Sequence, residues 1–152
     1  MDPIQRFDPE SENFTLVKQL LKEQGKDIDW LTSSVLSLSF GFVYATGKAN
    51  KYHVHGFVTC RAVNDNTHTI WIDLICSRIR SKVGKLLMEA AEAACKEIQG
   101  ILFINLYSLP EVKLRNWYKK LGYSENAVPA YQGGKPKAYL MTKYITSLDS
   151  KK

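Results

Sequence analysis

The segment Ile72–Glu97, IDLICSRIRSKVGKLLMEAAEAACKE, places the strongest constraint on the fold. It begins as an apolar strand, passes through a basic stretch, and continues with apolar residues at a helical spacing that extends one residue beyond it: Val83, Leu86, Leu87, Ala90, Ala91, Ala94 and Ile98. We therefore expect a helix from close to Lys82 to near Gly100, with this face against a sheet. The nearly continuous apolar run ILFINLYS (101–108) predicts a strand buried on both faces. Strand, helix and strand in this order predict a parallel pair.

The chain ahead of this segment is expected to form one helix and then strands. A first helix is predicted by an apolar face made of Phe14, Val17, Leu20 and Leu21. Ser11 is its candidate N-cap, and Gly25 follows its end. Strand-forming residues fill 33–46, 52–63 and 69–77, with the turn-forming segments GKANK and NDNTH between them. We expect three consecutive antiparallel strands.

The C-terminal part predicts one more helix and one more strand. Pro110 is at the usual first-turn position of a helix that would run to Leu121, and Gly122 follows it. KAYLMTKYI (137–145) predicts the last strand. The whole pattern is that of an α/β chain with a central mixed β-sheet flanked by helices.

Length and composition favour a single domain over residues 1–152, with flexible tails at 1–10 and 146–152. A chain of 152 residues with 45% hydrophobic content can bury one sizeable core. No apolar run approaches the length of a membrane-spanning helix, and the acidic N-terminus is unlike a secretory signal, so we expect a cytoplasmic protein. The three cysteines lie in apolar segments without metal-ligand spacing, which predicts buried thiols at Cys60, Cys76 and Cys95.

Four basic residues stand at the expected start of the long helix: Arg78, Arg80, Lys82 and Lys85. Cations at this end oppose the helix dipole, at a cost of about 0.3–1 kcal/mol each when exposed. A bound anion would offset that cost, because helix-start amides and nearby cations together hold phosphate oxygens. The net charge of +6 also fits a phosphate-bearing partner. The residues alone leave a phosphate site and an ordinary solvated basic surface equally open.

The order of strand, basic loop, Ala- and Leu-rich helix, buried strand and WYKKLGY resembles the acetyl-CoA-binding half of the GCN5-related N-acetyltransferases (GNAT). The loop signature of that family is Gln or Arg, two residues, Gly, one residue, and Gly or Ala. Gly84 matches its last position, whereas Ile79 and Lys82 stand at the other two signature positions. A Lys there would supply a cationic contact in place of close backbone approach.

A second family element is Tyr, three residues, Gly and an aromatic, and it is intact here as Tyr118, Gly122 and Tyr123. AYLMTKY is also similar to the family's closing strand, so the resemblance covers about residues 33–145. It implies acetyl-CoA as cosubstrate and direct attack of a neutral amine on the thioester.

The resemblance also implies where the cosubstrate binds. The pantetheine arm would insert between IDLICS and ILFINLYS, and a backbone N–H near residues 74–76 would stabilise the oxyanion. The cofactor-binding residues implied in this way are Leu74, Ile75, Cys76, Arg78, Ile79, Arg80, Ser81, Lys82, Val83, Gly84, Lys85 and Ser108.

Tyr118 is the candidate acid that would protonate the departing thiolate. On periodicity alone it is a core residue, because it shares a helical face with Leu114, Trp117 and Leu121. The family element favours the acid role.

Asp73 is the candidate base. In TIWIDLICS it lies between Trp71 and Ile75, on the face opposite Ile70, Ile72, Leu74 and Cys76. An unpaired carboxylate among apolar neighbours is costly, so Asp73 would either accept the amine's proton through water or hold the amine in place. A carboxylate paired with a neighbouring Lys or Arg is an equally good interpretation.

Two further candidate sites are less favoured by the sequence. His53 and His55 alternate onto one strand face, but no third ligand has suitable spacing, so solvated histidines are preferred over a metal pair. Cys76 would carry the acetyl group only in a ping-pong scheme, and no His or Asn stands in an interpretable relation to it.

Two functions follow from these patterns. The first is an acetyl-CoA-dependent N-acetyltransferase acting on a primary amine of a small molecule, a peptide or a protein, as a monomer or homodimer without membrane or nucleic-acid partners. The second is a non-catalytic domain whose basic surface binds nucleic acid or another polyanion.

Overall fold

The computed structural model describes residues 4–10, 12–24, 29, 31, 38–47, 53–62, 68–77, 82–126, 130–132 and 135–145. The chain divides into two compact units, one of residues 1–62 and 73–94 and the other of residues 63–72 and 95–152. Strand β4 (Thr69–Ser77) and helix α3 (Val83–Lys96) each contribute residues to both units. A single domain over the whole chain stays a prediction.

The strands form a mixed sheet in the order β1-β2-β3-β4-β5-β8-β6, with β7 paired to β8. In the first unit, β1 (Ile4–Arg6) pairs antiparallel with β2 (Phe40–Thr46), and β2 pairs antiparallel with β3 (His53–Ala62). Residues 4–6 are therefore not a flexible tail. The reason is that they extend the sheet and lead into Phe7, whose ring is buried against the rings of Phe14 and Phe57.

The strand predicted over 33–46 begins at Phe40 in the described residues, and residues 33–37 lie outside them. The other two predicted strands correspond to β3 and β4.

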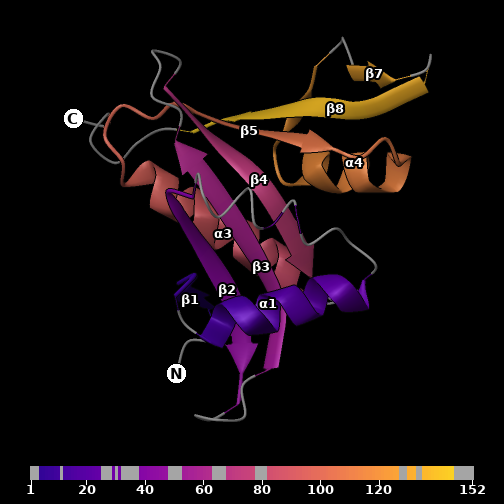
Figure 1. Cartoon of the computed structure of the whole chain (residues 1–152). Helices are drawn as coiled ribbons and strands as arrows, with labels where there is room; N and C mark the ends of the chain where they lie inside the picture. The colour runs from indigo at the N-terminus through magenta and orange to yellow at the C-terminus, as the bar shows by residue number, and fades with distance from the viewer. Residues whose placement is uncertain are drawn as a thin grey trace. The chain divides into compact units, whose positions relative to one another are not determined.

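Helices cover both faces of the first unit's strands, with α1 (Glu12–Glu23) in front of β2 and β3 and α3 behind them (Figure 1). The predicted apolar face of α1 is confirmed, because Val17, Leu20 and Leu21 are buried in a core with Val43 and Phe57. The proposed caps Ser11 and Gly25 lie outside the described residues. No helix among the described residues is long and apolar enough to cross a membrane.

The start of α3 is as predicted, because the Leu86 amide donates to the carbonyl of Lys82. Its end and its buried face differ from the prediction. The helix ends at Lys96, so Ile98 lies beyond it and is exposed, and Met88 is buried while Leu86 is exposed. Residues two apart in a helix point about 200° apart, so burying Met88 turns Leu86 to solvent.

The second unit contains the predicted parallel pair. Thr69–Ile72 of β4 pairs with Phe103–Leu106 of β5 (Phe103–Ser108), which in turn pairs antiparallel with β8 (Lys135–Tyr144). The short strands β6 (Ser124–Glu125) and β7 (Ala130–Gln132) also pair with β8. The prediction that β5 is buried on both faces is wrong. Its burial alternates, and Tyr107 is 58% exposed, because only one face of the strand lies in the core.

Helix α4 (Val112–Lys120) begins two residues later than Pro110 suggested. Glu111 is the N-cap, since its carbonyl accepts from the Arg115 amide, and Pro110 precedes the cap. The predicted end is confirmed: Leu121 is the C-cap, and Gly122 has a φ of 100°, a conformation that favours glycine.

Candidate functional site

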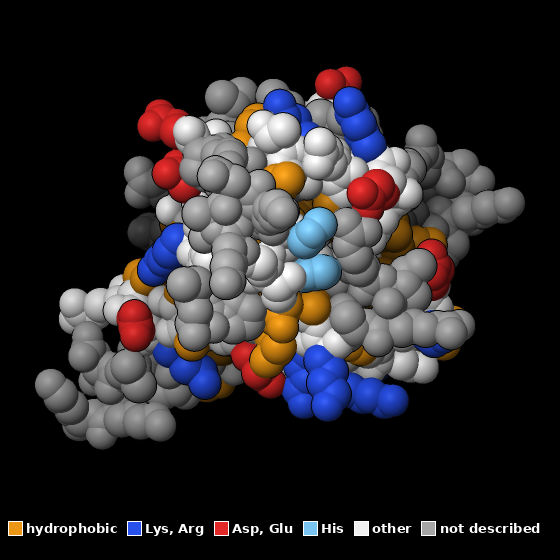
Figure 2. Space-filling model, turned by 90° about the horizontal axis from the view of Figure 1, so that it is seen from below, with side chains coloured by type: hydrophobic (Ala, Val, Ile, Leu, Met, Phe, Trp, Pro, Cys, Tyr) orange, Lys and Arg blue, Asp and Glu red, His pale blue; other side chains and the backbone are white. Residues whose placement is uncertain are grey.

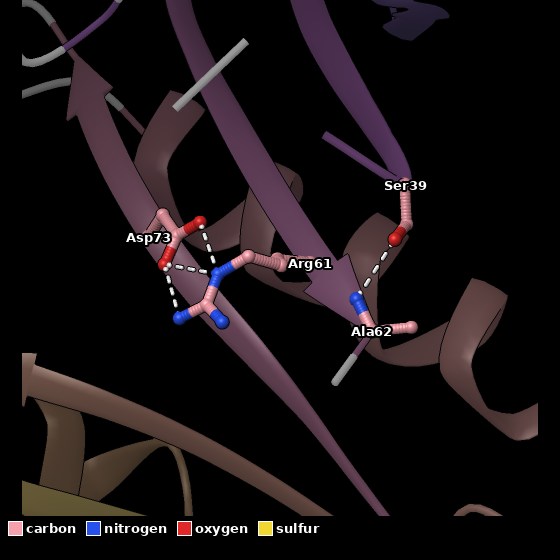
Figure 3. Close-up of polar contacts among 4 residues, drawn as sticks. All are labelled: Ser39, Arg61, Ala62 and Asp73. Carbon is pink, nitrogen blue, oxygen red and sulfur yellow. Dashed lines mark hydrogen bonds and ion pairs between the residues drawn. The ribbon is translucent and has the colours of Figure 1, made fainter. Parts of the chain in front are cut away.

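Asp73 of β4 forms an ion pair with Arg61 of β3 (Figure 3). The Arg61 Nε donates to both carboxylate oxygens, at 3.0 Å and 3.3 Å, and Nη2 donates to Oδ1 at 3.2 Å. The side chains of Arg61 and Asp73 are 34% and 18% exposed, so the pair is partly exposed to water. Of the two interpretations of Asp73, the paired carboxylate is confirmed. Its role as base stays a prediction.

Sequence reasoning missed Arg61. The polar turn at 64–68 indicated that the end of β3 lies beside the start of β4, but not which basic residue reaches Asp73. A second contact fixes the strand around Arg61. The Ser39 amide donates to the Cys60 carbonyl at 2.9 Å, and the Ala62 amide donates to Ser39 Oγ at 2.8 Å (Figure 3). The residues on both sides of Arg61 are therefore hydrogen-bonded to the segment that leads into β2.

The end of β4 is held by Gln24, which follows α1. The Gln24 Nε2 donates to the Ser77 carbonyl, and the Cys76 Sγ–H donates to Gln24 Oε1, each at 2.9 Å. Leu74 and Ile75 are half-buried, and Cys76 is buried, as predicted for all three cysteines. The amide oxygen that accepts from the Cys76 thiol is not a base that could take its proton, which fits a structural role for Cys76.

The phosphate loop is described only from Lys82 onward. Arg78, Ile79, Arg80 and Ser81 lie outside the described residues. Lys82 and Lys85 are exposed, Val83 and Gly84 are buried, and the first turn of α3 has no acidic residue. An exposed, cationic first helical turn without carboxylates is suited to an anionic group such as a phosphate.

Gly56 explains how closely β3 approaches this helix start. A Cβ at Gly56 would lie 2.7 Å from Val83 Cγ1 and 2.8 Å from the Cys76 carbonyl oxygen. Only a residue without a side chain lets strand and helix pack at this distance.

In the second unit, Tyr118 is buried on α4, with 4% of its surface exposed. Its ring makes edge contacts with those of Trp117 and Tyr123. Burial raises the pKa of Tyr118 to about 12, so the phenol stays protonated across the physiological range. Ser108 is also buried, and its hydroxyl donates to the Leu109 carbonyl at 2.9 Å.

Arg115, which sequence reasoning also missed, ties α4 to its surroundings. Its Nη1 donates to Glu125 of β6 at 2.8 Å, its Nε donates to the Pro110 carbonyl at 3.2 Å, and its guanidinium lies 4.0 Å from the ring centre of Tyr139. The hydrogen bond from Arg115 lowers the pKa of Glu125, although partial burial opposes the shift. The helix that carries Tyr118 is thereby fixed one turn before that residue.

His53 is exposed, and His55 Nε2 is hydrogen-bonded to Thr46 Oγ1 at 2.7 Å. Among the described residues, no group of three or more His, Cys, Asp or Glu is placed to hold a metal ion. On the face drawn in Figure 2, some of the described Lys and Arg side chains lie next to Asp and Glu, and others form a group at the lower centre of the view.

No family model matches the chain, and no curated protein matches it. Several solved structures match the chain over most of its length. Ard1 from Thermoplasma volcanium is 22% identical, with 93% of this chain and 96% of that chain covered and a TM-score of 0.66. The aminoglycoside 6'-N-acetyltransferase from Enterococcus faecium is 16% identical, with 93% and 96% covered and a TM-score of 0.71.

The chain has the GNAT fold. The ribosomal-protein-S18-alanine N-acetyltransferase from Escherichia coli matches it over 94% of each chain, with 15% identity and a TM-score of 0.68. The acceptors in these names range from an aminoglycoside to a protein alanine, so the GNAT fold leaves the substrate of this chain open.

Proposed function

We propose that this GNAT-fold chain is an acetyl-CoA-dependent N-acetyltransferase that modifies a primary amine. The observation that carries the proposal is the GNAT fold over more than nine-tenths of the chain. The local order of β4, basic helix start, α3 and β5 supports it. The parallel register of β4 with β5 covers Thr69–Ile72, and β4 then continues to Ser77. In the proposal, the main chain of residues 73–77 binds the pantetheine arm.

The reaction needs no covalent enzyme intermediate. The neutral amine attacks the thioester carbonyl, the nitrogen–carbon bond forms, and the carbon–sulfur bond breaks. A backbone N–H near Leu74–Cys76 stabilises the negative charge that develops on the carbonyl oxygen. Late in the step the thiolate takes a proton from the Tyr118 hydroxyl, the nitrogen loses a proton to solvent, and solvent returns a proton to the tyrosinate. Lys82 and Lys85 bind phosphate oxygens at the start of α3.

The role proposed for Tyr118 has a limit set by its burial. A phenol with a pKa of about 12 is a much weaker acid than an alkyl thiol with a pKa of about 8.5. Tyr118 therefore acts chiefly as a hydrogen-bond donor to the departing sulfur, with the proton following late. Asp73, already held by Arg61, positions the amine rather than serving as a free base.

A thermal-shift titration tests the proposal first. Acetyl-CoA at 100 times its dissociation constant should stabilise the fold by about 2.7 kcal/mol, and duplex DNA at the same charge concentration should not. Release of the coenzyme A thiol is then followed with a panel of primary amines. Stabilisation by DNA alone, without thiol release for any amine, would reverse the assignment in favour of polyanion binding.

A further inference from the structure

The guanidinium of Arg61 has donors that Asp73 does not use. Its Nε and Nη2 bind the carboxylate, whereas Nη1 makes no hydrogen bond to the part of the chain that the structure describes. Figure 3 shows this nitrogen turned away from Asp73. The Arg61 side chain as a whole is 34% exposed, so part of it is open to a small solute. A guanidinium edge of this kind is suited to a carboxylate.

The ion pair therefore presents a cation and an anion side by side on neighbouring strands. Both oxygens of Asp73 can accept further hydrogen bonds, because a carboxylate has about four lone-pair sites. An amino acid carries the complementary charges, a carboxylate and an amino group joined through one carbon. We propose that the acceptor of this enzyme is a free amino acid, with its carboxylate on Arg61 Nη1 and its amino group beside Asp73. This inference rests on the proposed acetyltransferase function.

Charge argues against the other acceptor classes. A polyamine or a lysine-rich tail needs carboxylates that no cation of the enzyme already neutralises, but Asp73 is neutralised by Arg61, and the chain carries a net charge of +6. The N-terminus of a protein has an amide where an amino acid has its carboxylate, so it would leave Arg61 Nη1 without an anionic partner. A small zwitterion satisfies both members of the pair.

The test compares the twenty L-α-amino acids with their α-carboxamides as acceptors, at saturating acetyl-CoA. Each matched pair differs only in the carboxylate. We expect wild-type kcat/KM to favour the acid for at least one amino acid by about 10- to 100-fold, the range for a hydrogen bond to a charged group. Arg61→Ala should remove that preference by raising KM for the acid, with little change for the carboxamide. Arg61→Lys, which keeps the charge but not the fork, should keep part of the preference.

Arg6→Ala is the matched control, since it removes one exposed arginine of the same unit whose guanidinium lies over the rings of Phe40 and Phe42, whereas that of Arg61 pairs with Asp73. It should leave the preference unchanged, and thermal unfolding of all variants checks that they are folded. If wild type has the same kcat/KM for carboxamides as for acids, or if Arg61→Ala lowers kcat/KM equally for both, the amino-acid assignment is wrong. The acetyltransferase function would still stand. Absence of acetyl-CoA binding and of thiol release with every amine would instead refute the proposed function, and this inference with it.

Discussion

Replacing Tyr118 with Phe removes one hydroxyl and keeps the ring that packs against Trp117 and Tyr123. The difference between a pKa of about 12 and about 8.5 makes full proton transfer to a thiolate unfavourable by roughly 5 kcal/mol. The hydroxyl then contributes a hydrogen bond to the developing thiolate, about 1.5–3 kcal/mol when charge-assisted. We expect kcat to fall by about 10- to 100-fold, at or below the lower edge of the range for general acids, with acetyl-CoA affinity nearly unchanged.

The assay is initial-rate thiol release at saturating amine and acetyl-CoA, with binding measured separately by calorimetry. Tyr123→Phe is the control, because Tyr123 is another buried tyrosine in contact with Tyr118 and loses the same group. The thiolate of a more acidic thiol leaves more easily without a hydrogen bond. With a thioester of such a thiol, Tyr118→Phe should therefore lose less kcat relative to wild type. A kcat within twofold of wild type would assign Tyr118 to the core alone.

The same variant tests the pKa itself. Because burial raises the folded-state pKa of Tyr118 from 10.0 to about 12, its contribution to stability is complete below pH 10 and is lost as pH rises toward 12. Two units correspond to roughly 2.7 kcal/mol. Tyr118→Phe should lose correspondingly less unfolding free energy than wild type between pH 10 and 12 in urea titrations. Equal losses in the two proteins would show that the phenol is not held neutral.

Three further outcomes are expected. Arg80→Ala combined with Lys82→Ala should weaken acetyl-CoA binding by about 1.5–3 kcal/mol per charge-assisted contact without altering the melting temperature, and unchanged affinity in calorimetry would remove the loop from the site. Cys76→Ala should retain most activity, with intersecting double-reciprocal plots; parallel lines or an acetylated Cys76 in mass spectrometry would require a ping-pong route. Gly56→Ala should destabilise the fold by about 1–3 kcal/mol in chemical denaturation, because its Cβ meets Val83 and the Cys76 carbonyl, and an unchanged midpoint would contradict that packing.

Local patterns in the sequence were sufficient for the order and type of most elements. Helical spacing in 83–96 and an apolar run at 103–108 predicted the helix and the parallel strand, and Gly122 marked the end of α4. These signals are reliable because each depends on residues within one or two turns. They failed at Leu86 and at Tyr107, where the neighbouring element decides which side of a helix or strand is covered.

The site depends much more on tertiary contacts. The sequence pattern indicated Asp73 and Tyr118 as candidate site residues, but it did not indicate which side chains contact the site. Arg61 is 12 residues from Asp73, and Gln24 is 53 residues from Ser77, to whose carbonyl it donates. Basic and amide side chains are common on surfaces, so nothing in their local pattern distinguishes the few that bind a distant strand. The sequence by itself determined that a carboxylate lies on β4, whereas the pairing of strands in three dimensions decided that a guanidinium neutralises it.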